Sequence, residues 1–163
     1  MVHSFLLSLA TLFGIGKLSK APGTVATFAT IPIWYVLAQA GPIIYMAVVF
    51  LLFPIGVWAA QLYENQSDTH DSKEIVIDEV VGFLITMTWM PFTWQSVVFG
   101  FLLFRFFDIV KPPPIRQLDK KIPGGFGVMV DDVAAGIISS ILMQGLLHQT
   151  NWLGTQISTL TAN

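Results

Sequence analysis

The fold is decided by TVATFATIPIWYVLAQAGPIIYMAVVFLLFPIGVWAAQLY, residues Thr24–Tyr63, a stretch without a single charged side chain. Its strongest interruption is Ala40-Gly41-Pro42, because a Gly-Pro pair is a signal for a turn. The stretch therefore predicts a helical hairpin with arms at about Thr24–Gln39 and Pro42–Leu62.

The whole chain shares this apolar character. Its 163 residues are 54% hydrophobic and 11% charged, and the mean hydropathy is +0.70. Soluble domains have about 25% charged residues, so we expect an integral membrane protein. No linker or repeat divides residues 1–163, which predicts one domain. A net charge of −2 without a basic arm gives no indication of nucleic-acid binding, and the absence of cysteine excludes thiolate catalysis.

A second apolar block runs from about Ile75 to Val110 and breaks at Met90-Pro91-Phe92-Thr93. Its first half is short for a membrane span of about 20 residues. We therefore expect that helix to begin at Ser72, where Asp71 and Glu74 resemble a capping box.

The two ends of the chain complete the predicted topology. The apolar run Phe5–Phe13 lacks the basic start of a signal peptide and predicts a short interfacial helix. A last span is expected from Asp132 to about His148, followed by a polar tail at 149–163. The fold class predicted is an all-α membrane bundle of about five (four to five) membrane helices, with four if residues 24–39 are re-entrant.

All charged residues fall in three stretches, Lys17–Lys20, Glu64–Glu79 and Arg105–Asp132. If each apolar block folds back at its middle, these stretches return to the same side of the membrane. The positive-inside rule places that side in the cytoplasm. We therefore expect chemistry on a lipid headgroup at this face.

Paired acids mark two of these stretches. Asp78 and Glu79 would lie more than a turn inside a helix that begins at Ser72, and ionisable residues on membrane helices are functional by default. Gly82, four residues after Asp78, would let another helix or a headgroup approach closely. The alternative is a purely structural role, in which the two acids stabilise the N-terminal end of a helix through their negative charge.

Basic residues gather around a triple proline. Arg105, Asp108 and Lys111 are spaced three apart and would share a helix face. Lys111 and Arg116 flank Pro112-Pro113-Pro114, which favours an extended segment. Cations held rigidly near a membrane suit a phosphate, although an Arg–Asp pair and positive-inside anchoring are structural alternatives.

The turn Gly124-Gly125-Phe126-Gly127 precedes the predicted last helix and could cradle an anion with its N–H groups. Asp131 and Asp132 would repel that anion unless a cation lies between them. Carboxylates without His or Cys favour Mg²⁺ or a similar hard ion that bridges to phosphate. Three carboxylate groups at helix ends, together with Lys and Arg, predict a metal-assisted phosphoryl site. His70 beside Asp71 could relay a proton, and the structural alternative is a solvated loop histidine.

Several motifs resemble the phosphatidylglycerophosphatase A family in combination and order. They are Gly14-Ile-Gly16, Ala21-Pro-Gly-Thr24, His70-Asp71, Ile75-Val-Ile-Asp78-Glu79-Val-Val-Gly82, Phe104-Arg105-Phe-Phe-Asp108-Ile-Val-Lys111-Pro-Pro-Pro-Ile-Arg116 and Gly124-Gly-Phe-Gly-Val-Met-Val-Asp131-Asp132-Val-Ala-Ala-Gly136. The resemblance covers Gly14 to about His148. Ala26-Thr27 depart from the Gly-Ser that the family often has after its Pro-Gly-Thr.

The resemblance implies a bacterial inner-membrane enzyme that hydrolyses phosphatidylglycerophosphate to phosphatidylglycerol with Mg²⁺. The expected catalytic residues are Asp78, Glu79, Asp131 and Asp132. The expected phosphate-binding residues are Arg105, Lys111, Arg116 and Thr24. The expected metal ligands are Glu79, Asp108, Asp131 and Asp132, with His70 and Asp71 as accessory residues.

Other functions stay open at this point. Because one fold serves several substrates, the substrate could be phosphatidic acid or a nucleotide-like phosphate monoester. A non-enzymatic cation carrier or assembly subunit is the remaining alternative. A carrier places its ionisable residues near the middle of the membrane, whereas here every charge lies toward one end.

Overall fold

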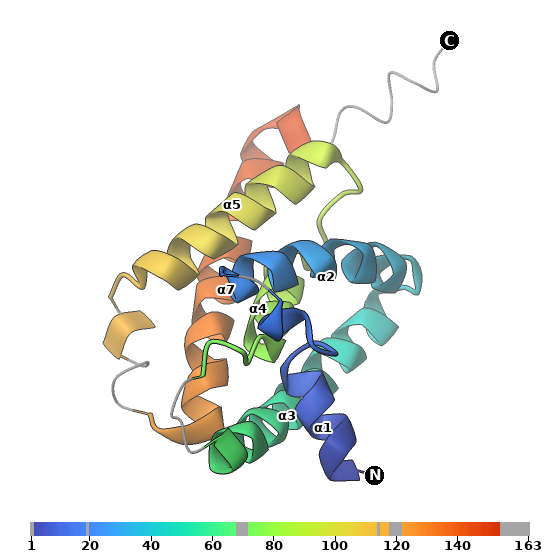
Figure 1. The fold of residues 1–163 in the computed structure, drawn as a ribbon. Helices are drawn as coiled ribbons and strands as arrows, with labels where there is room; N and C mark the ends of the chain where they lie inside the picture. The colour runs from blue at the N-terminus through green and yellow to red at the C-terminus, as the bar shows by residue number, and fades with distance from the viewer. Residues whose placement is uncertain (1, 19, 68–71, 114, 118–121, 154–163) are drawn as a thin grey trace.

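The computed structural model in Figure 1 consists of helices and short connections. It describes residues 2–18, 20–67, 72–113, 115–117 and 122–153. The described elements are α1 (Val2–Ala10), the 3-10 helix η1 (Ile15–Lys17), α2 (Pro22–Gln39), α3 (Pro42–Ser67), α4 (Ile77–Thr86), α5 (Trp94–Val110), α7 (Gly124–Gln149) and the 3-10 helix η2 (Asn151–Leu153). These residues contain no strand, which confirms the all-α prediction.

Both predicted breaks between helices are present. Gly41 separates α2 from α3 with a φ of 96°, a left-handed conformation that glycine adopts at little cost. Pro42 then opens α3, where its missing N–H leaves no helical bond unmade. At the second break Thr93 caps α5, and its hydroxyl accepts a hydrogen bond of 3.2 Å from the Ser96 amide.

The predicted start of the fourth helix is wrong. α4 begins at Ile77, and residues 72–76 form a turn in which the Ile75 amide donates to the Ser72 carbonyl at 2.9 Å. Asp78 and Glu79 therefore lie in the first turn of α4 instead of deeper in the helix. Asp71 of the proposed capping box lies outside the described residues.

The predicted start of the last helix is also wrong. α7 begins at Gly124, so the glycines form its first turn, and Asp131 and Asp132 lie about two turns inside it. A Cβ on Gly125 would overlap the α3 backbone at Val57 and Gln61. The Gly125 amide donates to Gln61 Oε1 at 3.0 Å. The glycine-rich turn thus packs a helix start against α3.

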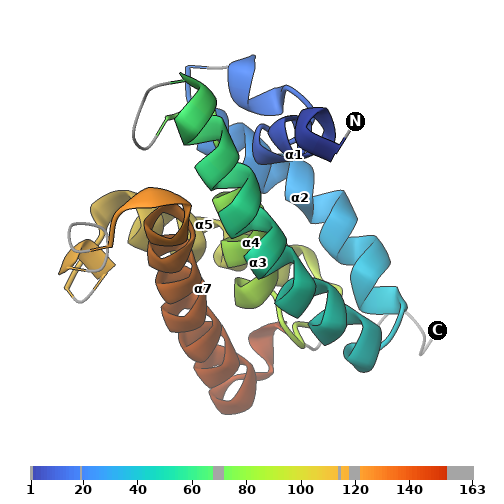
Figure 2. The same ribbon diagram turned by 90° about the horizontal axis from the view of Figure 1, so that it is seen from below.

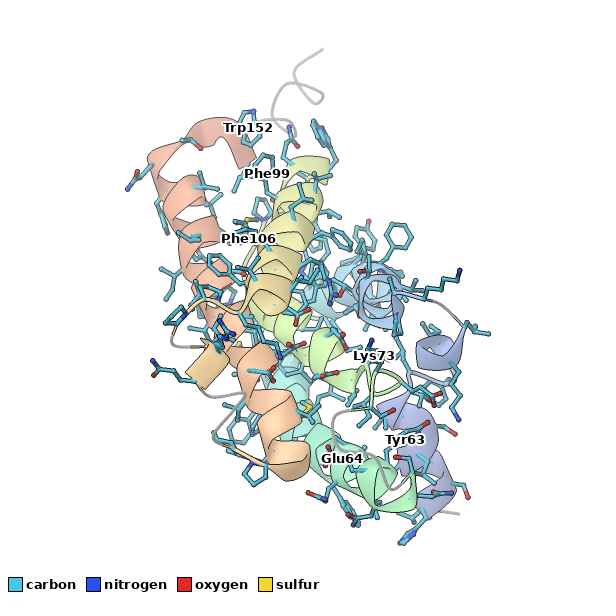
Figure 3. All side chains as sticks on the ribbon, turned by 60° about the vertical axis from the view of Figure 1, so that its left-hand side comes forward. Tyr63, Glu64, Lys73, Phe99, Phe106 and Trp152 are labelled. Carbon is cyan, nitrogen blue, oxygen red and sulfur yellow. The ribbon has the colours of Figure 1, made fainter. Side chains whose placement is uncertain are left out.

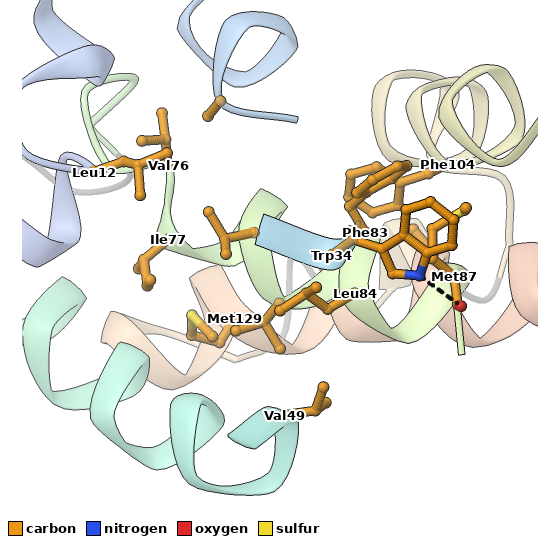
Figure 4. Close-up of a cluster of buried hydrophobic side chains, with 14 of the residues drawn as sticks. Leu12, Trp34, Val49, Val76, Ile77, Phe83, Leu84, Met87, Phe104 and Met129 are labelled. Atoms are coloured by element: carbon orange, nitrogen blue, oxygen red, sulfur yellow. Dashed lines mark hydrogen bonds between the residues drawn. The ribbon is translucent and has the colours of Figure 1, made fainter. Parts of the chain in front are cut away.

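α4 is the central helix of the bundle. It contacts α2, α3, α5 and α7, and Figure 2 shows it enclosed by them. Its apolar residues are buried around most of the helix, as expected for an internal helix. Figure 4 shows Phe83 and Leu84 in this core, where the Trp34 indole N–H donates to the Met87 carbonyl at 3.1 Å. This packing fixes the position of the acids at the start of α4.

Two helices, α3 and α7, are long and apolar enough to cross a membrane. α3 exposes Ile43, Phe50 and Leu51, and contiguous exposed apolar side chains mark a surface that faces lipid or a partner. The ten residues of α4 rise only about 15 Å, half of a bilayer core of about 30 Å. The prediction of five membrane helices is therefore not confirmed.

The two ends of the bundle differ in chemistry. In Figure 3, Phe99 and Trp152 lie together at one end, whereas Tyr63, Glu64 and Lys73 lie toward the other. The Phe99 and Trp152 rings pack edge to face with centroids 4.7 Å apart.

Candidate functional site

A cavity of about 270 Å³ lies between the start of α2, the start of α4, the end of α5 and α7. Side chains from two of the three charged stretches, Glu64–Glu79 and Arg105–Asp132, meet here beside the start of α2. Its lining residues are Ala21, Pro22, Gly23, Ser72, Lys73, Ile75, Asp78, Glu79, Arg105, Asp108, Lys111, Asp131 and Asp132.

Three carboxylates form a compact cluster in this cavity. One oxygen each of Asp78, Glu79 and Asp132 lie within 4.8 Å of one another. α4 and α7 can come this close because Gly82 and Gly136 have no side chain at the contact. A Cβ on Gly82 would overlap the Asp132 carbonyl, and one on Gly136 would overlap the Gly82 carbonyl. The prediction that Gly82 allows a close approach is thus confirmed, and the neighbour is α7.

The cluster has unused acceptor atoms. Asp78 Oδ1, Glu79 Oε2 and Asp132 Oδ2 are buried and have no hydrogen-bond partner among the described residues. Burial raises the pKa of the Asp78 carboxyl well above its ordinary value, and the charges of Glu79 and Asp132 raise it further. Burial also raises the pKa of Glu79. A site that offers only carboxylate oxygens as ligands, three of them without a hydrogen-bond partner, suits a hard divalent cation.

Arg105 connects two helices at the edge of the cluster. Its Nη1 atom lies 2.5 Å from Asp108 Oδ2 and 3.5 Å from Glu79 Oε1. The predicted Arg105–Asp108 pair is therefore confirmed. Because this nitrogen contacts both carboxylates, Arg105 holds Glu79 of α4 against α5.

Lys111 ends α5 in an unusual conformation. It has a φ of 45° and a ψ of 58°, and its amide donates to the Phe107 carbonyl at 2.9 Å. Left-handed backbone is uncommon for residues other than glycine and often occurs at functional sites. This turn brings the Lys111 ammonium into an ion pair with the Asp131 carboxylate of α7.

The triple proline differs from its prediction. Pro112 and Pro113 lie in a turn, and the Ile115 amide donates to the Pro112 carbonyl at 2.8 Å, so these two residues do not form an extended segment. Pro114 lies outside the described residues. Arg116 is exposed and does not line the cavity.

Thr24 lies half-buried in the first turn of α2 and does not line the cavity either. The accessory candidates His70 and Asp71 lie outside the described residues.

Sequence reasoning missed the contribution of Gly23, Ser72 and Lys73. A Cβ on Gly23 would overlap Glu79 Oε1, so this glycine lets the start of α2 reach the acid cluster. The signal was present in Ala21-Pro22-Gly23, because proline is favoured in the first turn of a helix. This motif predicts the start of a helix, but it does not indicate which side chains the helix start faces.

Comparison of the amino-acid sequence with known proteins identifies the family of this chain. The family model described as phosphatidylglycerophosphatase A matches residues 8–147. The chain belongs to this family. Phosphatidylglycerophosphatase A of Escherichia coli (strain K12) is 39% identical over 141 residues, which cover 86% of this chain and 82% of that protein. Phosphatidylglycerophosphatase A of Haemophilus influenzae (strain Rd) is 41% identical over 137 residues, covering 83% and 84%.

A third relative bears a different name. A protein of Bacteroides thetaiotaomicron named "Putative phosphatidylinositol-3-phosphatase" is 38% identical over 144 residues, which cover 83% of this chain and 89% of that protein. No solved structure matches the chain. As a member of the phosphatidylglycerophosphatase A family, the chain is a phosphoric monoester hydrolase.

Proposed function

We propose that this enzyme hydrolyses phosphatidylglycerophosphate to phosphatidylglycerol and inorganic phosphate at the cytoplasmic face of a bacterial inner membrane. The observation that carries the proposal is the cavity in which acids from α4 and α7 meet basic residues from α5. Its position in a bundle with two membrane-length helices suits a lipid phosphate monoester. The relatives named phosphatidylglycerophosphatase A support this substrate.

We propose Mg²⁺ as the cofactor, held by Asp78, Glu79 and Asp132, of which one oxygen each lies within 4.8 Å of the others. Of the metal ligands expected from the sequence, Asp108 contacts Arg105 and Asp131 contacts Lys111. Neither belongs to the group of three residues whose oxygens lie within 4.8 Å of one another, so we place these two carboxylates beside the metal site. When bound, Mg²⁺ would neutralise negative charge on the phosphoryl oxygens.

The remaining side chains would orient the reaction. Arg105 keeps Glu79 and Asp108 in place, and Lys111 does the same for Asp131. We assign to Asp131 the role of accepting a proton from the water that attacks phosphorus. Pro22 and Gly23 at the start of α2 line the same cavity, where the helix dipole favours a bound anion.

The membrane arrangement is part of the proposal. α3 and α7 would cross the bilayer. α2 and α5, with 18 and 17 residues, rise about 26–27 Å and would cross with them. α4 would stay enclosed between these helices. The basic residues around the cavity would face the cytoplasm.

The test is phosphate release by the purified protein in detergent, with Mg²⁺ or with a chelator. We expect release from phosphatidylglycerophosphate in Mg²⁺ and little release in the chelator. Phosphatidic acid and phosphatidylinositol 3-phosphate belong in the same panel, because the Bacteroides relative is named for the latter lipid. A preference for either of these two lipids would overturn the substrate assignment.

A further inference from the structure

Three basic side chains line the cavity, and they differ in their partners. Arg105 contacts Glu79 and Asp108, and Lys111 contacts Asp131. Lys73 also lines the cavity, but within the described part of the chain no carboxylate lies within ion-pair distance of its ammonium. Lys73 is thus the lining cation that is available to an incoming anion.

The turn that contains Lys73 is fixed by contacts with α1 and η1. The Ile75 amide donates to the Ser72 carbonyl at 2.9 Å, and the Val76 amide donates to the Ala10 carbonyl of α1 at the same distance. A Cβ on Gly16 would overlap the Glu74 carbonyl, so η1 packs directly on the turn. The backbone of Lys73 is therefore anchored, and only its side chain needs ordering when a ligand binds.

The neighbouring acid is engaged elsewhere. The Tyr63 hydroxyl donates to Glu74 Oε2, and the Lys17 ammonium lies 3.9 Å from the same atom. Glu74 does not line the cavity. The turn thus presents its acid to α3 and η1 and its lysine to the cavity, where Lys73 has no ion-pair partner among the described residues.

Depth separates Lys73 from the acid cluster. Lys73 is exposed, whereas Asp132 is 2% exposed. A substrate whose reacting phosphate lies at the cluster would place the rest of its headgroup near Lys73. In phosphatidylglycerophosphate that remainder contains a second phosphate, the diester between the glycerol and the diacylglycerol.

We propose that Lys73 binds this diester phosphate and favours lipids that carry a phosphodiester beside the terminal monoester. The proposal rests on the proposed function, because it takes the monoester phosphate to lie at Asp78, Glu79 and Asp132. Phosphatidic acid has only the monoester and gains nothing from Lys73. Lys73 is then a residue for substrate specificity.

The experiment compares two inhibitors that separate the two phosphates. Short-chain dihexanoyl phosphatidylglycerol carries only the diester, and inorganic phosphate mimics the monoester. We expect Lys73→Gln to weaken binding of the short-chain lipid about tenfold, the size of a lost charge-assisted hydrogen bond, and to leave binding of inorganic phosphate unchanged. Lys73→Arg should restore most of the affinity. Lys20→Gln, an exposed lysine outside the cavity lining, is the matched control.

Two results would overturn the proposal. One is unchanged binding of the short-chain lipid by Lys73→Gln, and the other is an equal loss of affinity for inorganic phosphate. Isothermal titration measures both affinities without turnover. Failure of the unmodified enzyme to hydrolyse phosphatidylglycerophosphate would therefore reject the proposed function separately from the role of Lys73.

Discussion

The Arg105 guanidinium on α5 lies 3.5 Å from the Glu79 carboxylate on α4, and both side chains are largely buried, with 14% and 13% exposed. The same nitrogen lies 2.5 Å from Asp108. One cation therefore holds carboxylates from two helices at the edge of a cluster of like charges. Its removal would affect stability as well as catalysis.

Replacing Arg105 by Met should destabilise the protein by about 3–5 kcal/mol, because breaking a buried pair leaves charges without compensation. Arg105→Lys keeps the charge and should lose less. Thermal denaturation in detergent measures both variants. If Arg105→Met melted at the same temperature as the parent, the contacts of Arg105 with Glu79 and Asp108 would not contribute to the stability of the protein.

Asp132→Asn should lower phosphate release about 10²–10³-fold, because it removes a proposed ligand of the Mg²⁺ that would stabilise negative charge in the transition state. The thermal stabilisation by Mg²⁺ should shrink in parallel. Ser139→Ala is a suitable control, since this buried α7 hydroxyl has no hydrogen-bond partner among the described residues and lies outside the cavity lining. If Asp132→Asn were as active as the control, the assignment of Asp132 to the active site would be wrong.

Gly23→Ala should reduce activity about 10²-fold, because the added Cβ would displace Glu79 and small displacements of reacting groups have effects of this size. The control is Gly145→Ala on α7, where a Cβ meets nothing within 4 Å. That substitution should keep activity and stabilise the helix by about 1 kcal/mol. Steady-state phosphate release and thermal denaturation distinguish the two variants.

The raised pKa of Asp78 predicts how stability depends on pH without metal. Above the ordinary pKa of an aspartate, the folded state keeps a proton that the unfolded chain has lost. Stability should therefore fall as the pH rises toward the folded pKa. Metal-free protein should melt at a lower temperature at pH 8 than at pH 5.5.

Mg²⁺ should raise the melting temperature more at pH 8, because a cation and protons compete for the same oxygens. Asp78→Asn should flatten the pH dependence. A metal-free melting temperature that rises between pH 5.5 and pH 8 in the parent but not in Asp78→Asn would contradict this interpretation.

The orientation in the membrane can be tested with single cysteines, since the chain has none of its own. Lys20 and Ala40 are both exposed, at the start and the end of α2. In spheroplasts a membrane-impermeant maleimide should label Ala40→Cys and spare Lys20→Cys. Inside-out vesicles should show the reverse pattern, and labelling of both variants in intact spheroplasts would exclude the proposed orientation.

The sequence by itself determined the helical class, the breaks at Gly41 and before Thr93, and the charged residues around the cavity with the exception of Lys73. These features follow from local rules. A Gly-Pro pair disfavours a continuous helix wherever it occurs, and ionisable side chains are too costly in an apolar body to lie anywhere but at a polar face or a shared site.

Only the tertiary structure decided where α4 and α7 begin and which charges pair. α7 starts at Gly124 because Gln61 of α3 accepts a bond from the Gly125 amide, a contact 64 residues distant in sequence. Asp131 and Asp132 were both expected to be metal ligands, yet Asp132 joins Asp78 and Glu79 while Asp131 contacts Lys111. Neighbouring helical residues point in different directions, so only the packing of α4, α5 and α7 assigns each carboxylate its partner.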